Sequence, residues 1–290
     1  MEPLTPEERH VIEDKGTEAP FSGEYDTFFE NGIYVCRRCL NPLYRSLDKF
    51  SSLCGWPSFD DHLPKGVKKE LDQDGKRTEI LCASCNGHLG HVFEGEKLTQ
   101  KNTRHCVNSL SMRFLSFETL LDMSLANHPR FDVAFVAGGC FWGVEFFFTK
   151  EKGVLATQVG YSGGDLDHPT YQQVCSSDTG HVETVAVIYD KQENNVHDLY
   201  TLFFNIHDPT QEDRQGPDQG SQYRSVIFYR NLDQKKEAAA CIQALHAKKI
   251  DAVTKLVVFK TFWPAENAHQ KYYQKTGKLP YCHTKVIRLP

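Results

Sequence analysis

Two Cys-x-x-Cys pairs constrain the fold of this chain more than any other feature of its sequence. The first pair is Cys36 and Cys39, the second is Cys82 and Cys85, and 42 residues separate the two pairs. Four thiolates presented by two tight turns suit one tetrahedral Zn²⁺ ion with no open coordination position. The sequence therefore predicts a structural zinc site. A dithiol redox pair is the alternative, disfavoured because two matched pairs occur and no helix is expected after either.

The length and composition of the chain fit two globular domains without a nucleic-acid or membrane partner. The chain has 290 residues, of which 40% are hydrophobic, and a net charge of −5. Domains usually hold about 100–200 residues, and a negative chain is a poor match for nucleic acid or an anionic membrane. No apolar run reaches the roughly 18 residues of a membrane span. The N-terminus lacks the apolar segment of a secretory signal, so we expect a cytoplasmic protein with reduced thiols.

The pattern of predicted elements changes along the chain and indicates two domains. Residues 1–114 hold short strand-like segments separated by Gly, Pro, Asn and Asp, residues 115–131 form a linker with room for one short helix, and residues 132–290 alternate strands with helices. The expected strands include 32–35, 78–81, 89–93, 133–137, 182–189, 225–229 and 255–259, and the expected helices include one capped by Thr5, one opening at 141–148, and 197–206 and 233–249.

Six further cysteines stand alone, and Cys140 has the most reactive setting among them. It follows Gly138-Gly139 at the end of a predicted strand and precedes Phe141 and Trp142 at a predicted helix start. The amides and dipole of a helix N-terminus favour the thiolate, which is the nucleophilic form. The two aromatic rings would form an apolar wall for a small hydrophobic group. An inert core thiol is the alternative.

The other isolated cysteines divide into reactive candidates and bystanders. Cys106 has polar neighbours, Cys54 lies in a turn next to an aromatic residue, and Cys282 lies near the C-terminus. Chain ends are mobile, and a resolving thiol needs mobility. An inert thiol stays an open alternative for each of these three. Cys241, in an alanine-rich helix, and Cys175 are interpreted as bystanders.

These motifs resemble those of the methionine sulfoxide reductases over nearly the whole chain. Residues 1–114 resemble the B type through the four zinc cysteines and the segments Cys-Gly-Trp-Pro-Ser-Phe at 54–59, Gly-His-Leu-Gly-His-Val-Phe at 87–93 and Arg-His-Cys-Val-Asn-Ser at 104–109. Residues 132–290 resemble the A type through Gly-Cys-Phe-Trp-Gly at 139–143, Gly-Tyr-Ser-Gly-Gly at 160–164, Pro-Thr-Tyr at 169–171, Gly-His-Val-Glu at 180–183 and Gly-Ser-Gln-Tyr-Arg-Ser at 220–225. The resemblance implies a zinc-containing, mainly antiparallel β domain followed by an α+β sandwich of ferredoxin-like type.

The same resemblance implies a bifunctional enzyme that reduces methionine sulfoxide, free or in oxidised proteins and peptides. Cys140 is the implied nucleophile for the S-sulfoxide and Cys106 for the R-sulfoxide, since each enzyme type acts on one epimer. Cys282 and Cys54 match the resolving positions, so each nucleophile would pass through a sulfenic acid to an intradomain disulfide. A thioredoxin-like dithiol would then reset the enzyme. Only Cys282 follows Cys241, so a second disulfide relay in the tail is not expected.

The resemblance also implies supporting residues in each site and no organic cofactor. Glu183 would protonate the departing oxygen if an apolar pocket raises its pKa, although a glutamate in a strand more often faces solvent. The other implied A-type residues are the wall residues Phe141 and Trp142, the hydrogen-bond donors Tyr171 and Tyr223, and Asp218. The implied B-type residues are the pocket wall Trp56, the polar candidates His88, His91 and Asn108, and Arg104, which would favour a thiolate.

Three alternatives follow from the residues alone. His88 and His91 could complete a Cys/His metal site, but four thiolates already close the coordination of zinc. A zinc-ribbon interaction module joined to an α/β domain would bind partners without turnover. A general disulfide oxidoreductase would use the same thiols without consuming methionine sulfoxide.

Overall fold

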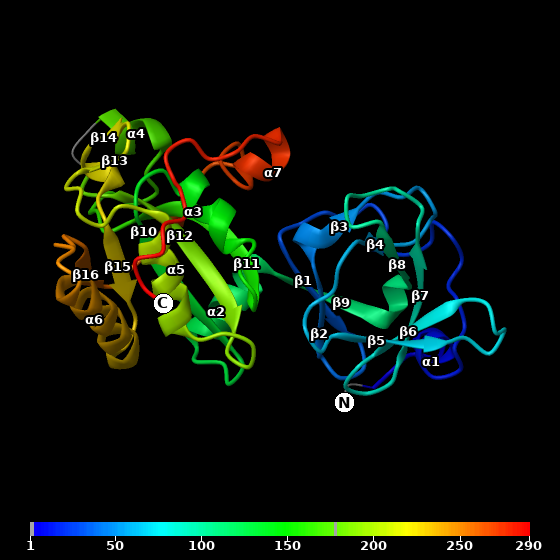
Figure 1. The fold of residues 1–290 in the computed structure, drawn as a ribbon. Helices are drawn as coiled ribbons and strands as arrows, with labels where there is room; N and C mark the ends of the chain where they lie inside the picture. The colour runs from blue at the N-terminus through cyan, green and yellow to red at the C-terminus, as the bar shows by residue number, and fades with distance from the viewer. Residues whose placement is uncertain (1–2, 177–178) are drawn as a thin grey trace. The chain divides into compact units, whose positions relative to one another are not determined.

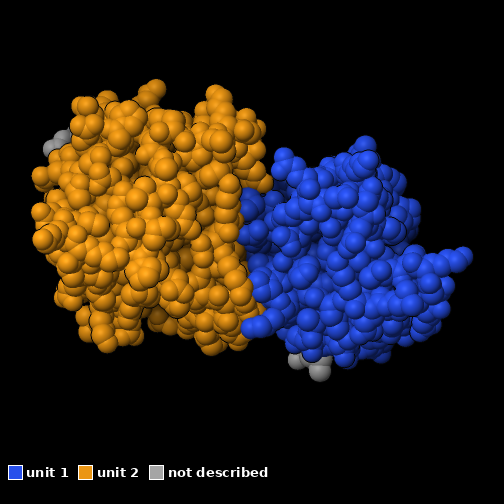
Figure 2. Space-filling model, viewed as in Figure 1, with its two compact units in different colours: residues 1–120 blue, residues 121–290 orange. Residues whose placement is uncertain are grey.

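The chain folds into two compact units in a computed structural model. The model describes residues 3–176 and 179–290; residues 1–2, at the start of the first predicted domain, and 177–178 lie outside the described residues. Unit 1 covers residues 1–120 and unit 2 covers residues 121–290 (Figure 2). Two domains, the first built mainly of β-strands, are thus confirmed (Figure 1). Among the described helices, none combines the length and apolar character needed to cross a membrane.

Unit 1 consists of two antiparallel sheets. The first has the order β2 (Pro42–Arg45), β1 (Gly32–Cys36), β9 (Met112–Ser116). The second has the order β3 (Lys49–Phe50), β4 (Ser58–Phe59), β8 (Thr103–Val107), β7 (His88–Glu94), β6 (Thr78–Cys82), β5 (Val67–Leu71). Fully buried rings fill the core, with Tyr44 and Phe59 stacked at 4.3 Å between ring centroids.

Helix α1 (Pro6–Ile12) and two short 3-10 turns complete unit 1, and helix α2 (Phe117–Leu125) spans the boundary between the two units. Helix α1 starts at Thr5 with a capping box, in which Thr5 Oγ1 accepts from the Glu8 N–H and Glu8 accepts from the Thr5 N–H. The predicted N-cap is therefore confirmed. Helix α2 lies within the predicted linker. The 3-10 turns are η1 (Ser46–Asp48), η2 (Ser109–Ser111) and, in unit 2, η3 (Ser221–Tyr223).

Unit 2 is built on a six-stranded sheet with helices packed against it. The strand order is β16 (Lys255–Val258), β15 (Val226–Tyr229), β10 (Phe131–Ala137), β12 (Val182–Asp190), β11 (Val154–Ser162), β17 (Phe262–Pro264). Every neighbouring pair is antiparallel except β15 and β16. The remaining elements are α3 (Phe141–Phe148), α4 (Tyr171–Ser176), α5 (Val196–Ile206), α6 (Leu232–Ala247) and α7 (Tyr272–Thr276), and a small ribbon of β13 (Arg214–Gln215) and β14 (Asp218–Gln219).

Strand β12 lies inside the sheet and is buried along its whole length. All nine of its residues are buried, including Glu183 and Thr184. On neighbouring β10, Ala134 and Val136 join the core beneath the helices, whereas the ring of Phe135 stacks on Phe259 at 4.0 Å. A strand covered on both faces has no solvent side. The pattern-based expectation that a strand glutamate faces water is therefore wrong for Glu183.

A buried ion pair fixes the segment after β17 to helix α3. Lys271 Nζ lies 2.8 Å from Glu145 Oε1, and the Lys271 N–H donates to Glu145 Oε2 at 3.0 Å. The Glu145 side chain is 3% exposed and that of Lys271 15%. This anchor places α7 beside α3, where the Tyr272 ring stacks on Trp142 with 3.8 Å between centroids.

We expect Lys271→Met to destabilise unit 2 by about 3–5 kcal/mol, because it leaves the Glu145 carboxylate buried without its cation. Urea unfolding followed by circular dichroism measures the change. Lys275→Met, an exposed lysine on the same short helix, is the matched control and should shift the free energy of unfolding by no more than about 0.5 kcal/mol. Equal effects of the two variants would contradict the structural role of the ion pair.

Candidate active sites

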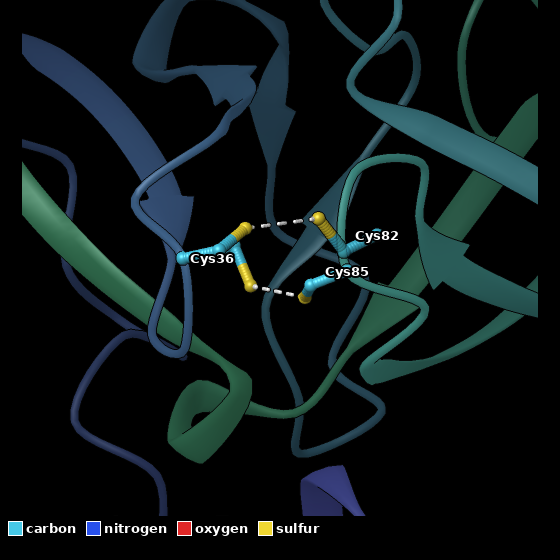
Figure 3. Close-up of side chains that lie close together, drawn as sticks. Cys36, Cys82 and Cys85 are labelled. Carbon is cyan, nitrogen blue, oxygen red and sulfur yellow. Dashed lines mark hydrogen bonds between the residues drawn. The ribbon is translucent and has the colours of Figure 1, made fainter. Parts of the chain in front are cut away.

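The four paired cysteines meet at one point in unit 1. Cys36 ends β1 and Cys82 ends β6, and each begins a tight turn that brings its Cys-x-x-Cys partner back. The Cys36 and Cys85 sulfurs are 3.6 Å apart, as are those of Cys39 and Cys82, and all four lie within 4.8 Å of one another (Figure 3). Zn–S bonds of about 2.3 Å in a tetrahedron place sulfurs roughly 3.8 Å apart. The cluster is therefore compatible with zinc.

The second pair of thiols in unit 1 joins β8 to the loop before β4. Cys106 Sγ lies 3.8 Å from Cys54 Sγ. The hydrogen bond with Cys106, and a further one from Ser52, lower the pKa of Cys54 to about 4. The same contact with Cys54, followed by burial, raises the pKa of Cys106. The contacts around the pair thus favour the thiolate form of Cys54.

Arg104 is positioned to support that charge. Its Nη1 lies 3.5 Å from Cys54 Sγ, and Glu96 holds the guanidinium with hydrogen bonds of 2.7 and 2.9 Å. The sequence predicts that Arg104 favours a thiolate: its Nη1 bonds to Cys54, and its charge and hydrogen bond oppose the rise in the pKa of Cys106. Its guanidinium also covers the Phe93 ring at 4.5 Å.

Cys106 opens into a pocket of about 140 Å³. The lining includes the rings of Trp56 and Phe93 and the polar side chains of His91 and Asn108. An apolar wall with a few polar groups suits a small ligand that carries a methyl group and one polar atom. The structure thus brings together Cys106, Trp56, His91 and Asn108.

Glu18, which the sequence did not single out, holds two of these pocket residues in place. Its carbonyl oxygen accepts from Trp56 Nε1 at 3.1 Å, and its N–H donates to Asn108 Oδ1 at 3.0 Å. Its buried carboxyl group accepts from the backbone N–H groups of Ser109 and Leu110. These contacts span 38 to 92 positions of sequence, so no local pattern reveals them.

His88 lies behind the pocket at the end of a polar chain. Its Nδ1 is 2.7 Å from Glu79 Oε1, and Lys15 Nζ is 2.8 Å from Glu79 Oε2. Burial tends to raise the pKa of Glu79, but the hydrogen bonds from Lys15 and His88 hold it below its ordinary value. Nδ1 therefore donates to a carboxylate. Within the described part of the chain, the buried Nε2 of His88 has no hydrogen-bond partner, so it can form a hydrogen bond with a ligand.

In unit 2, Cys140 occupies the N-cap of α3 and is 6% exposed. A hydrogen bond with Cys282 and burial raise the pKa of Cys140, while the N–H groups of Trp142 and Gly143 oppose the shift. Glu183 Oε2 accepts from the Phe141 N–H at 2.9 Å, which places the carboxyl group at the same helix start. Burial, followed by the charge of Cys140, raises the pKa of Glu183 well above its ordinary value. Burial thus favours the protonated form of Glu183.

Cys282 reaches this point from the tail of the chain. The sulfurs of Cys140 and Cys282 and a carboxylate oxygen of Asp218 lie within 4.8 Å of one another. The tail is fixed beyond the thiol, since Asn205 Oδ1 accepts from the N–H groups of Arg288 and Leu289. Cys282 is only 9% exposed. The Cys282 thiol is thus buried against the start of α3, although it lies near the end of the chain.

Aromatic rings surround the thiols of unit 2. Phe141 is fully buried, and the ring of His269 lies 5.4 Å from Phe141, 5.6 Å from Trp142 and 4.5 Å from Tyr171. Burial raises the pKa of both Tyr171 and Tyr223, so both phenols keep their protons as donors. Sequence reasoning missed His269, which lies outside every motif that carried the resemblance.

The remaining cysteines differ in setting. Cys241 lies in the core of unit 2 on α6 and is 1% exposed. Cys175 lies on α4, four positions after Tyr171. The residue as a whole is exposed, but partial burial of its thiol raises the pKa of that thiol. Neither thiol belongs to the Cys140–Cys282 pair.

Comparisons with known proteins agree with this two-site geometry. Residues 132–289 match the family described as "Peptide methionine sulfoxide reductase", and residues 4–116 match the "SelR domain". The chain is 51% identical over 146 residues to peptide methionine sulfoxide reductase MsrA of Methanosarcina acetivorans, covering 49% of this chain and 78% of the relative. It is 47% identical over 153 residues to MsrA of Acinetobacter baumannii, covering 53% and 88%.

A solved structure shares the fold of unit 2. Reduced Mxr1 from Saccharomyces cerevisiae superposes with a TM-score of 0.52 and 32% sequence identity, over 56% of this chain and 94% of Mxr1. The A-type match covers more than half of the chain, and the SelR match precedes it. The chain therefore belongs to the peptide methionine sulfoxide reductase family and carries a SelR, or B-type, domain followed by an A-type domain.

Proposed function

We propose that unit 2 reduces the S-epimer of methionine sulfoxide and unit 1 the R-epimer, both through sulfenic acid and intradomain disulfide chemistry. The observation that carries the proposal is that each unit pairs two thiols beside an aromatic wall, Cys140 with Cys282 and Cys106 with Cys54. One thiol attacks the sulfoxide and the other removes the resulting sulfenic acid. The substrates are methionine sulfoxide, free or within oxidised proteins and peptides.

In unit 2, the first step moves one oxygen atom from the sulfoxide to Cys140. The Cys140 sulfur attacks the sulfoxide sulfur while Glu183 donates its proton to the oxygen, and Tyr171 and Tyr223 donate hydrogen bonds to it. The thiol proton of Cys140 passes to Glu183, so a thiol and a sulfoxide give a sulfenic acid and a thioether. Phe141 and Trp142 form the apolar wall for the methyl group. Asp218 orders the site through the hydrogen bond that Tyr281 donates to it at 3.1 Å.

In unit 1, one thiol acts as the nucleophile and the other as the resolving thiol. Cys106 faces the pocket and acts as nucleophile, with Trp56 against the methyl group and Asn108, His91 and His88 as polar contacts for the oxygen. Because Nδ1 of His88 donates to Glu79, its unpartnered Nε2 carries a hydrogen for that contact only in the imidazolium form, which the Glu79 carboxylate stabilises. Cys54 has a low pKa and already carries the charge needed to attack a sulfenic acid. Arg104 stabilises that charge.

The completed cycle needs an external dithiol and a stable frame. Each disulfide is reduced by exchange with a thioredoxin-like donor. Zinc on Cys36, Cys39, Cys82 and Cys85 supplies binding energy to the fold of unit 1 and takes no part in the reaction. The strand order β15-β10-β12-β11, with α3 and α5 as crossovers, supports a ferredoxin-like description of unit 2.

Substituting each nucleophile separately should divide the two activities. We expect Cys140→Ser to abolish reduction of the S-epimer and leave the R-epimer rate unchanged, and Cys106→Ser to do the reverse. The measurement is methionine formed from each purified epimer with a dithiol donor. Cys241→Ala, which changes a thiol of α6 outside both pairs, is the control and should retain both rates. Persistence of S-epimer reduction in Cys140→Ser would overturn the assignment.

Glu183→Gln should lower kcat/KM for the S-epimer by about 10²–10⁴-fold, because it removes the proton donor. In the unsubstituted protein the active form is the protonated one. The S-epimer rate should therefore be retained at low pH and fall as pH rises through the raised pKa of Glu183. The R-epimer rate of the same chain is the internal control. If the S-epimer rate of Glu183→Gln still fell as pH rose, the titration would belong to another group.

Zinc should be bound at about one equivalent per chain and lost in Cys39→Ser, because three thiolates and a hydroxyl bind the ion weakly. Elemental analysis of purified protein measures the content. Loss of the ion removes folding energy from unit 1, so R-epimer activity should fall while S-epimer activity is kept. Cys175→Ser should retain the metal. A full equivalent in Cys39→Ser would rule out the four-cysteine site.

A further inference from the structure

We propose that His283 is the base that activates the resolving thiol Cys282, an inference that rests on the function proposed above. His283 Nδ1 lies 3.0 Å from Cys282 Sγ. Both side chains are buried, with 4% of His283 and 9% of Cys282 exposed. The two residues are neighbours in sequence, yet the contact requires the tail to fold back onto the start of α3.

The tautomer of His283 is determined by its second nitrogen. Nε2 lies 2.7 Å from the carbonyl oxygen of Gly138, and a carbonyl oxygen only accepts hydrogen bonds. Nε2 must therefore carry the hydrogen. In the neutral ring Nδ1 then has a lone pair, so the Cys282 thiol is the donor in the contact between them. Burial lowers the pKa of His283, despite the opposing bond to Gly138, and so favours this neutral form.

The ring is also fixed relative to the nucleophile. A Cβ atom added at Gly143, in the first turn of α3, would lie 2.2 Å from His283 Nδ1. Only glycine leaves room for the ring at that position, three residues after Cys140. The ionisable groups around the ring are Cys140 and Cys282, Asp218 of β14, and His207 at the end of α5.

This geometry gives a balanced second step. Nδ1 of His283 takes the proton of Cys282 as the Cys282 sulfur attacks the sulfur of the Cys140 sulfenic acid. The S–O bond breaks, an S–S bond forms, and the proton held by His283 passes to the departing oxygen to give water. The imidazole returns to its neutral form, and no further oxidant or reductant is consumed. His283 thus acts on the resolving step and not on oxygen transfer from the substrate.

The test is a single turnover of reduced protein with the S-epimer of methionine sulfoxide and no external dithiol. His283→Gln can keep a donor toward Gly138 but supplies no base. We expect methionine to form in the first turnover, while loss of the two thiols slows by about 10²-fold or more. The Cys140 sulfenic acid should accumulate and be trapped by a cyclic 1,3-diketone. His246→Gln, an exposed histidine on α6, is the matched control and should resolve at the unsubstituted rate.

The pH dependence separates a base from a purely structural contact. In the unsubstituted protein, the thiol-loss rate should level off once His283 is neutral. In His283→Gln it should rise about tenfold per pH unit until Cys282 itself ionises, because hydroxide then has to remove the proton. Equal thiol-loss rates with the same pH profile would overturn the proposal.

Two further outcomes are distinguishable. Absence of methionine from the unsubstituted protein would contradict the proposed function itself. If His283→Gln formed no methionine, the rate at which iodoacetamide alkylates Cys282 would be measured as a function of pH. The two proteins compared would be Cys140→Ser and the double variant Cys140→Ser, His283→Gln. A base predicts an apparent thiol pKa that rises when His283 is replaced. An unchanged alkylation profile would contradict the proposed base.

Discussion

The burial of Glu183 is the constraint on which the rest of unit 2 depends. An ionised carboxylate in a low dielectric carries a large desolvation cost, and the neighbouring groups that raise its pKa further, Cys140 and Asp218, are themselves negative when ionised. Above the pKa of an exposed glutamate, the folded state therefore binds a proton that the unfolded state releases. Stability must fall as pH rises through that window. The role proposed for Glu183 in oxygen transfer requires this neutral form.

The central strand makes that arrangement possible. β12 pairs with β10 on one side and β11 on the other, so its backbone is fully bonded and its side chains are covered. Glu183 lies opposite Tyr161 of β11, and the Phe141 N–H at the start of α3 reaches its carboxyl group. The acid and the nucleophile thus take their relative position from the sheet and one helix terminus. In unit 1 the thiol pair has a cation beside it instead, since Arg104 Nη1 lies 3.5 Å from Cys54 Sγ.

The parts of the structure that the sequence predicted are those encoded over short distances. Spacing alone identified the four-cysteine cluster, local context favoured Cys140, and the family resemblance was needed to separate Cys106 from an inert thiol. The family resemblance was needed to predict that Glu183 is buried, because strand periodicity indicated the opposite. Glu18, which holds two pocket residues in unit 1, depends on contacts across 38 to 92 positions. The buried state of Cys282 also escaped prediction, since the Asn205 contacts that fix the tail link residues 84 positions apart.

The setting of Cys282 imposes opposite demands on the two halves of the catalytic cycle. Disulfide formation needs Cys282 close to Cys140, whereas exchange with an external dithiol needs the bond to be approached by an incoming thiolate. The segment that carries Cys282 is fixed before it by Lys271 on Glu145 and after it by Arg288 and Leu289 on Asn205. Residues 278–285 have contacts of their own as well, since Tyr281 donates to Asp218 and Nε2 of His283 lies 2.7 Å from the Gly138 carbonyl oxygen. A disulfide between Cys140 and Cys282 would add a covalent link to the start of α3. An external dithiol therefore has to reach the bond while the tail stays in place.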